Sequence, residues 1–143
     1  MQRRRGGVRD RGTNSTPTFR GRSRPKTRSC LAANNYASSL IHRRLFEEAK
    51  TLLRKAVPVA QRANGESTVN TLRMRTNYAR ALYEDPGATL ADLREAVTTL
   101  EDTERIARRT LGGAHPLAAW LSGIFLRKVR AALRARETPS GEA

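Results

Sequence analysis

The chain repeats part of its own sequence, and this self-similarity constrains its fold more than any single residue does. Segment 35–40, which reads Asn-Tyr-Ala with a Leu three residues after the Ala, recurs at 77–82 with an offset of 77 − 35 = 42. A second set of positions recurs at an offset of 95 − 48 = 47, namely Glu48, Ala49, Leu53, Ala60, Arg62 and Gly65 as Glu95, Ala96, Leu100, Ala107, Arg109 and Gly112. The difference of 47 − 42 = 5 residues falls at 85–89, where the first copy has a tight connection near 43–44. The sequence therefore predicts one helix-turn-helix unit written twice, with its length variation in a loop.

The apolar residues within each copy follow a helical period. One stripe lies in segment 45–62 and consists of Leu45, Ala49, Leu52, Leu53, Ala56 and Ala60. Another lies in segment 90–111 and consists of Leu90, Leu93, Val97, Leu100, Ala107 and Leu111. Both segments are predicted to be amphipathic helices. A last helix is expected from about Pro116 to about Arg136, because proline suits the first turn of a helix.

Local signals place the ends of these helices. Thr89 followed by Asp92 is a capping-box pattern, and residues 85–87, Asp-Pro-Gly, predict the turn before it. The glycines at 112–113 are expected to end that helix. Pro58 lies inside segment 45–62 and predicts a kink, since it removes a backbone hydrogen bond to the carbonyl of Arg54. Nothing alternates with the period of a strand, so the fold class is predicted to be all-α.

The quoted motifs resemble the tetratricopeptide repeat, specifically the roughly 42-residue variety of the kinesin light chain type. The matching features are Asn-x-Ala with its Leu in the inner helix, the step Phe-Glu-Glu-Ala at 46–49, and Leu-Gly-x-x-His-Pro at 111–116. The resemblance covers residues 31 to about 120. It implies antiparallel helix hairpins, an α-solenoid fragment, closed by a C-terminal helix. In this scheme Leu45, Leu53, Ala60, Leu93, Leu100 and Ala107 form the core between helices.

Three departures from the family pattern stand out. The junction at 64–69 lacks the His-Pro pair, and the third inner helix reads Ile-Phe-Leu at 124–126 where the first two copies read Asn-Tyr-Ala. About two and a half repeats are present, fewer than the three or more that usually stabilise such stacks. A fragment, a divergent copy and half of an oligomer remain open as explanations.

In this family the inner helices line a concave surface that binds a partner's peptide segment, and the inner-helix Asn bonds the ligand's backbone. Carried over, that role falls on Asn35 and Asn77, whose amides offer both a donor and an acceptor. The alternative is that each Asn bonds a neighbouring helix terminus. Arg73 and Arg80 lie one turn either side of Asn77 and would favour an acidic ligand, unless they form a solvated basic face. Tyr36 and Tyr78 each follow an Asn but lie on a different side of the helix, and they are expected to be packing residues with a solvated hydroxyl.

No motif for catalysis or cofactor binding is present, and the protein is predicted not to be an enzyme. His42 and His115 have no acidic or Cys partner at metal-ligand spacing, and His115 is expected to cap the last helix. The sequence has no Gly-rich phosphate loop and no nucleophile elbow. We therefore expect no cofactor and no metal.

The N-terminal segment 1–29 carries most of the excess charge. It has ten basic residues and one acid, a net of +9 out of +15 for the chain, with few apolar residues. It is predicted to be a disordered arm, followed by a helical-repeat domain at 30–136 and a disordered tail at 137–143. Its Arg-Gly steps resemble segments that contact RNA, so a nucleic-acid-associated protein acting through the arm is the first alternative function.

The remaining signals concern compartment and assembly. Cys30 is the only cysteine, so no internal disulfide can form, and the longest apolar stretch, 117–126, is about half of a membrane span. We expect a cytoplasmic protein without membrane contact, and an organelle transit peptide is only disfavoured. The second alternative function is self-assembly, in which the face at 117–126 docks a second copy or a further repeat and buries Trp120.

Overall fold

The computed structural model describes residues 25–138, and every element in that range is a helix. In chain order they are α1 (Pro25–His42), α2 (Phe46–Asn64), α3 (Val69–Glu84), α4 (Leu90–Leu111), α5 (Pro116–Trp120), the π-helical turn η2 (Leu121–Phe125) and α6 (Leu126–Glu137). The predicted all-α fold class is confirmed for this part of the chain. None of these helices combines the length and the apolar character that crossing a membrane requires.

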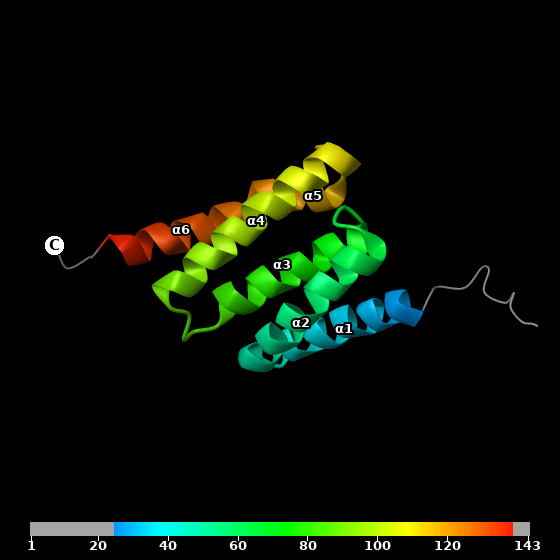
Figure 1. Cartoon of the computed structure of the whole chain (residues 1–143). Coiled ribbons are helices and arrows are strands. Elements are labelled where there is room, and N and C mark those ends of the chain that lie inside the picture. The colour runs from blue at the N-terminus through cyan, green and yellow to red at the C-terminus, as the bar shows by residue number, and fades with distance from the viewer. Residues whose placement is uncertain (1–24, 139–143) are drawn as a thin grey trace, which may run out of the picture.

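The helices form two hairpins followed by a closing segment. Helices α1 and α2 make the first hairpin, α3 and α4 make the second, and α3 packs against both α1 and α2. The continuous run α5, η2 and α6 packs against α4. Figure 1 shows this order, with α3 in the middle, the first hairpin on one side of it, and α4 with α6 on the other. Helix α3 therefore contacts α1 on one face and α2 and α4 on another.

The repeated apolar positions form the core of both hairpins. Each equivalent pair is at most 2% exposed, and the pairs are Ala37 and Ala79, Leu40 and Leu82, Ala49 and Ala96, Leu53 and Leu100, and Ala60 and Ala107. Of the other predicted core residues, Leu93 is buried, whereas Leu45 is half-buried beside the tight turn. The self-similarity of the sequence is thus a repetition of packing positions.

The helix ends also repeat. Gly65 ends α2 with φ 95°, and Gly112 ends α4 with φ 92°, values that a residue with a side chain rarely adopts. Thr68 caps α3 by accepting a hydrogen bond from the Thr71 N–H. His115 caps α5 in the equivalent place through its Nδ1, 3.1 Å from the Leu117 nitrogen, which confirms the predicted cap.

The predicted capping box of α4 is also confirmed. The Asp92 N–H donates to the Thr89 hydroxyl at 3.0 Å, and the Thr89 N–H donates to the Asp92 carboxylate at 2.9 Å. The hydrogen bond from the Thr89 backbone is the main reason that the pKa of Asp92 lies below its ordinary value. The start of α4, the second and outer helix of its hairpin, is therefore fixed by two reciprocal hydrogen bonds, whereas the equivalent helix α2 starts without a side-chain cap.

The helical body extends further than predicted at both ends. Helix α1 begins at Pro25, so residues 25–29 belong to a helix and not to the arm. Proline suits a first turn, and Cys30, only 2% exposed, is buried in the following turn of α1. Glu137, assigned to the tail, is the last residue of α6 and pairs with Arg94 at 3.2 Å. The rest of the predicted arm and tail, residues 1–24 and 139–143, lies outside the described residues.

Two further details concern helix continuity. Helix α2 runs without interruption from Phe46 to Asn64 and includes Pro58 in its interior. The last helix, expected from about Pro116 to about Arg136, contains a π-helical turn at Leu121–Phe125. Ser122 and Gly123 lie in this turn, and the Ser122 hydroxyl donates to the Ala118 carbonyl at 3.1 Å. Such turns accommodate one extra residue in an otherwise regular helix.

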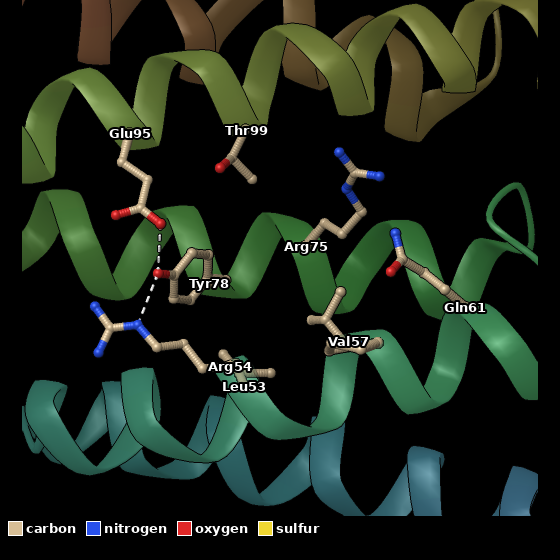
Figure 2. Close-up of a pocket in the computed structure, with 9 residues that line it drawn as sticks. Leu53, Arg54, Val57, Gln61, Arg75, Tyr78, Glu95 and Thr99 are labelled. Carbon is tan, nitrogen blue, oxygen red and sulfur yellow. Dashed lines mark hydrogen bonds between the residues drawn. The ribbon is translucent and has the colours of Figure 1, made fainter.

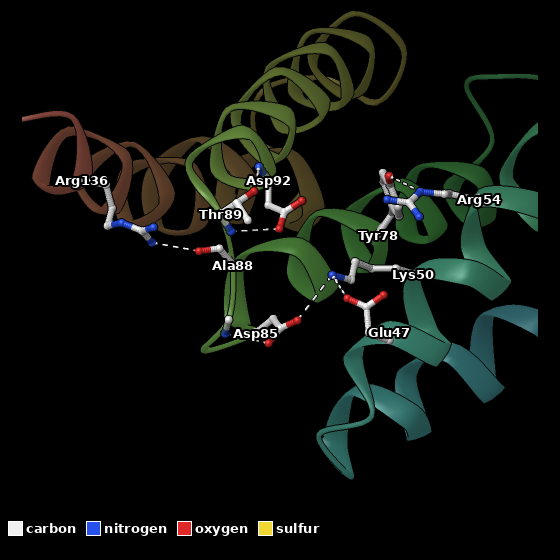
Figure 3. Close-up of polar contacts among 10 residues, drawn as sticks. Glu47, Lys50, Arg54, Tyr78, Asp85, Ala88, Thr89, Asp92 and Arg136 are labelled. Carbon is white, nitrogen blue, oxygen red and sulfur yellow. Dashed lines mark hydrogen bonds and ion pairs between the residues drawn. The ribbon is translucent and has the colours of Figure 1, made fainter.

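A buried lysine joins the first hairpin to the loop of the second. The Lys50 side chain on α2 is 4% exposed, and its ammonium lies 2.7 Å from Glu47 and 3.4 Å from Asp85 (Figure 3). Burial lowers the pKa of Lys50, but the hydrogen bonds to Glu47 and Asp85 and the charges of Glu47 and Asp92 outweigh burial and raise the pKa above its ordinary value. On the other side of the same loop, Arg136 of α6 donates to the Ala88 carbonyl at 3.0 Å. The α3–α4 loop is therefore held from both flanking units.

Candidate functional site

The four residues predicted to bind a ligand line one cavity. Asn35 on α1 and Arg73, Asn77 and Arg80 on α3 surround an open hollow of about 360 Å³. Helix α5 closes the third side with Leu117 and Trp120. This surface is shared by α1 and α3, the first and inner helix of each hairpin, and by the start of the closing segment. We call it the inner groove.

The helical period explains why these side chains gather. Arg73, Asn77 and Arg80 are four and three residues apart, so they form one stripe along α3. Asn34 and Ser38 are four residues apart on α1 and line the groove opposite that stripe. The caps of α3 and α5 set where each of these helices begins, and the buried repeat positions set which face each one turns inward.

Asn77 lies at the centre of a polar network. Its Nδ2 donates to the Oδ1 of Asn34 at 2.8 Å, and its own Oδ1 accepts a long hydrogen bond of 3.5 Å from Arg80. Asn77 therefore bonds side chains and not the neighbouring helix terminus that was the alternative. The amide nitrogen has a second hydrogen and the amide oxygen a second lone pair, so Asn77 can still hold a peptide unit.

Asn34 is a groove residue that was not predicted from the sequence. The repeat alignment singles out Asn35, because Asn35 matches Asn77 at the offset of 42. Asn35 lines the groove but is exposed, and Asn34 makes the hydrogen bond that connects α1 to α3. The spacing of Asn34 and Ser38 on one helical stripe was the available signal.

The two predicted arginines differ in whether a carboxylate neutralises their charge. Arg80 is paired with Glu84 at 3.0 Å, so its charge is largely neutralised within α3. Arg73 is exposed, and no ion pair to it is recorded within residues 25–138. The inner groove therefore has a net positive charge that comes from Arg73.

Trp120 gives the groove an aromatic wall. The side chain is 38% exposed and its ring lies 5.0 Å from that of Phe125, measured between centroids. Phe125 is buried in the core of the second hairpin, where it also meets Tyr83 edge-on at 6.1 Å. Trp120 is thus anchored from behind while part of its surface remains open to the groove.

The two repeated tyrosines have different surroundings. Tyr78 packs against the core, and its hydroxyl donates to Glu95 at 2.6 Å and accepts from the Arg54 Nε at 3.0 Å. Burial and the bond to Glu95 raise the pKa of Tyr78. The expected packing role is confirmed for Tyr78, but Tyr36 is 56% exposed and the expectation is wrong there. Tyr78 lies between α2 and α4. In the described part of the chain no helix comes before α1 to cover Tyr36 in the same way.

The histidines make local backbone contacts. The Nδ1 of His42 lies 2.9 Å from the Ser38 carbonyl, one turn earlier, and His115 caps α5. Within residues 25–138 no group of three or more His, Cys, Asp and Glu side chains is placed to hold a metal ion.

Comparison of the chain with protein-family models, with curated proteins and with solved structures finds no match in any of the three. No activity or ligand therefore carries over from a relative, and a functional argument rests on the residues of the chain itself.

Proposed function

We propose that the protein is a non-enzymatic interaction module that binds a partner's peptide segment in the inner groove. The main observation in support is that the four residues singled out from the repeat line one cavity between the inner helices, namely Asn35, Arg73, Asn77 and Arg80. The proposal includes the assignment of the two hairpins to tetratricopeptide-like repeats of the kinesin light chain type. Support for that assignment is the burial of the shared positions in both copies.

The polar groups of the groove suit a polypeptide backbone. Asn34 and Asn77 together present amide donors and acceptors on facing helices, and only one hydrogen bond of 2.8 Å joins them. A peptide unit needs both kinds of partner, and side-chain amides supply both without selecting the ligand's side chains. The groove thus offers backbone recognition along its centre.

Charge and the aromatic wall set the preference among peptides. Arg73 places an uncompensated guanidinium at the groove, which favours an Asp or Glu side chain or a terminal carboxylate. Trp120 offers an apolar surface at the same cavity. The preferred segment therefore carries an acidic residue close to an apolar one.

The test is capture of labelled ten-residue peptides of acidic, neutral and basic composition by the full chain. Acidic peptides should bind, and Asn77→Ala should weaken binding about tenfold, because each neutral hydrogen bond between its amide and a peptide unit is worth about 0.5–1.5 kcal/mol. Arg73→Ala should weaken the acidic peptides and leave neutral ones unchanged. Helical circular dichroism and the unfolding temperature are measured for each variant to show that it is folded.

Arg109→Ala is the matched control, because Arg109 is an exposed arginine of α4 outside the groove. Equal loss of binding in Arg73→Ala and Arg109→Ala would show that only the general positive charge matters. If binding is unchanged in folded Asn77→Ala protein, the inner groove is not the binding site.

A second candidate function, self-assembly, is favoured by the open side of the closing segment. Ile124 is 55% exposed and Trp120 38% exposed on adjacent turns of α5 and η2. A second copy packed there would bury both side chains. Light scattering on the full chain distinguishes the two, because assembly requires a mass above 15.9 kDa that falls to this value in Ile124→Glu.

A further inference from the structure

A second cavity lies on the other side of α3, between the outer helices α2 and α4. We call it the outer pocket; its volume is about 300 Å³, and it brings Arg54 and Gln61 of α2, Arg75 of α3, and Glu95 and Thr99 of α4 together (Figure 2). On α3, Arg75 and Tyr78 lie roughly half a turn from the stripe that faces the inner groove. The two cavities therefore open on opposite faces of one helix.

Arg75 is the unusual residue of this pocket. Its side chain is 14% exposed, yet its nearest carboxylate, Asp102, is 4.0 Å away and is also held by Arg105 at 3.0 Å. The guanidinium group of Arg75 has five N–H donors. None of them makes a hydrogen bond to another of the described residues. A largely buried charge with such weak compensation is costly, and an anion in the pocket would remove that cost.

The remaining charges define how much negative charge the pocket accepts. Arg54 lies at the other end, where its Nε donates to Tyr78 and its two terminal nitrogens have no recorded partner in the described residues. Glu95 accepts from the Tyr78 hydroxyl at 2.6 Å and adds one negative charge. Among the residues that line the pocket, two arginines against one glutamate leave a net charge of +1, and the nearby Asp102 is shared between Arg75 and Arg105. This charge suits a monoanion and opposes a phosphate dianion.

The residues that line the pocket favour one kind of monoanion over others. The planar guanidinium fork of Arg75 matches a carboxylate with two parallel hydrogen bonds. In Figure 2 Gln61 lies beside Arg75 at one end of the pocket, and Thr99 faces it from α4. Leu53 and Val57 form an apolar floor. We propose that the outer pocket binds a carboxylate attached to an apolar group, with Arg75 as its principal partner.

Such a carboxylate can come from a free small acid or from the end of a peptide chain. The probes are therefore phenylacetate and acetyl-Ala-Leu-Phe with a free C-terminus, each compared with its amide. The readout is the change of backbone and side-chain NMR signals of the full chain as probe is added to millimolar concentration. The uncharged amides are matched in shape, so the comparison isolates the carboxylate.

Phenylacetate should shift the signals of Tyr78 and Thr99, and phenylacetamide should bind about tenfold more weakly. Arg75→Met should lose the carboxylate preference, whereas Arg105→Met, which removes the other arginine at Asp102, should keep it. Preference for the free-ended peptide over phenylacetate would identify a chain terminus as the source, and the reverse would identify a free acid.

Three results would overturn the proposal: equal binding of phenylacetate and phenylacetamide, no binding of either carboxylate, or shifts confined to Trp120. The last result would place the carboxylate in the inner groove. The wild-type comparisons need no variant, so the proposal stays testable even if Arg75→Met fails to fold. Because the readout distinguishes Tyr78 from Trp120, failure here leaves the inner-groove function untouched.

Discussion

The two hairpins share their packing residues and differ in their chemistry. Ala37 with Leu40 and Ala79 with Leu82 are buried alike, yet the positions one turn either side of the shared Asn are Leu31 and Ser38 in the first copy and Arg73 and Arg80 in the second. The positive charge that lines the inner groove is therefore supplied by α3. Repetition accounts for the scaffold, and the residues that break the repetition give the inner groove its charge.

The loops show the same contrast. The first hairpin closes with a tight turn in which Arg44 adopts φ 63°. The second closes with a longer loop whose Asp85 is bonded to Lys50. The longer loop of the second copy thus gives it a contact to the first that a tight turn could not make.

The largest effects are expected where the copies are equivalent. Leu53→Ala and Leu100→Ala each remove a fully buried side chain at the same repeat position. Each should lower the free energy of unfolding by about 2–5 kcal/mol. Urea unfolding followed by circular dichroism measures both. If one substitution is nearly neutral, the two hairpins do not share one packing scheme.

A smaller effect is expected at the link between the copies. Lys50→Met keeps much of the side-chain volume but removes the ammonium that Glu47 and Asp85 share. The free energy of unfolding should fall by about 1–3 kcal/mol, because the partly buried Asp85 loses its cation. Lys55→Met on the same helix serves as control. Equal effects of the two substitutions would show that the link contributes nothing.

The helix caps predict a pH dependence limited to the second copy. Asp92 has a lowered pKa, so its contribution is complete above its unfolded pKa of about 3.9 and is lost as the pH falls through the lower folded value. Asp92→Asn should cost about 1 kcal/mol at pH 6 and progressively less below pH 4. Urea midpoints at several pH values measure this. A cost that does not change with pH would contradict the assigned capping role.

The smallest effects concern the tyrosines. Tyr78→Phe removes the hydroxyl between Arg54 and Glu95 and should cost about 0.5–1.5 kcal/mol. Tyr36→Phe, at the exposed equivalent position, should change stability by less than about 0.5 kcal/mol. Thermal unfolding of the two variants tests the difference. A larger loss in Tyr36→Phe would reverse the comparison.

Local rules were sufficient for much of the architecture. The capping box of Thr89, the His115 cap and the start of α4 at Leu90 depend on neighbours within one helical turn, and the sequence predicted all three. The buried stripes followed from the helical period in the same way. The gathering of Asn35, Asn77, Arg73 and Arg80 in one cavity followed from aligning the repeat.

Contacts between distant segments were not predictable in this way. The bond between Asn34 and Asn77 and the ion pair between Lys50 and Asp85 depend on how one hairpin turns against the next. The π-helical turn that follows Trp120 also has no distinct signal in the sequence. The outer pocket needs three helices to be placed together before Arg75 can be recognised as weakly compensated.

The most direct test of the inner groove uses Trp120, the single tryptophan of the chain, as a reporter inside the cavity. Its fluorescence is measured while acidic and basic peptides are added to the full chain and to Arg73→Glu. Acidic peptides should produce a saturable change in the natural chain, and Arg73→Glu should reverse the preference in favour of basic peptides. Trp120 fluorescence that changes with neither peptide, or an acidic preference that survives Arg73→Glu, would show that the inner groove does not bind acidic peptides.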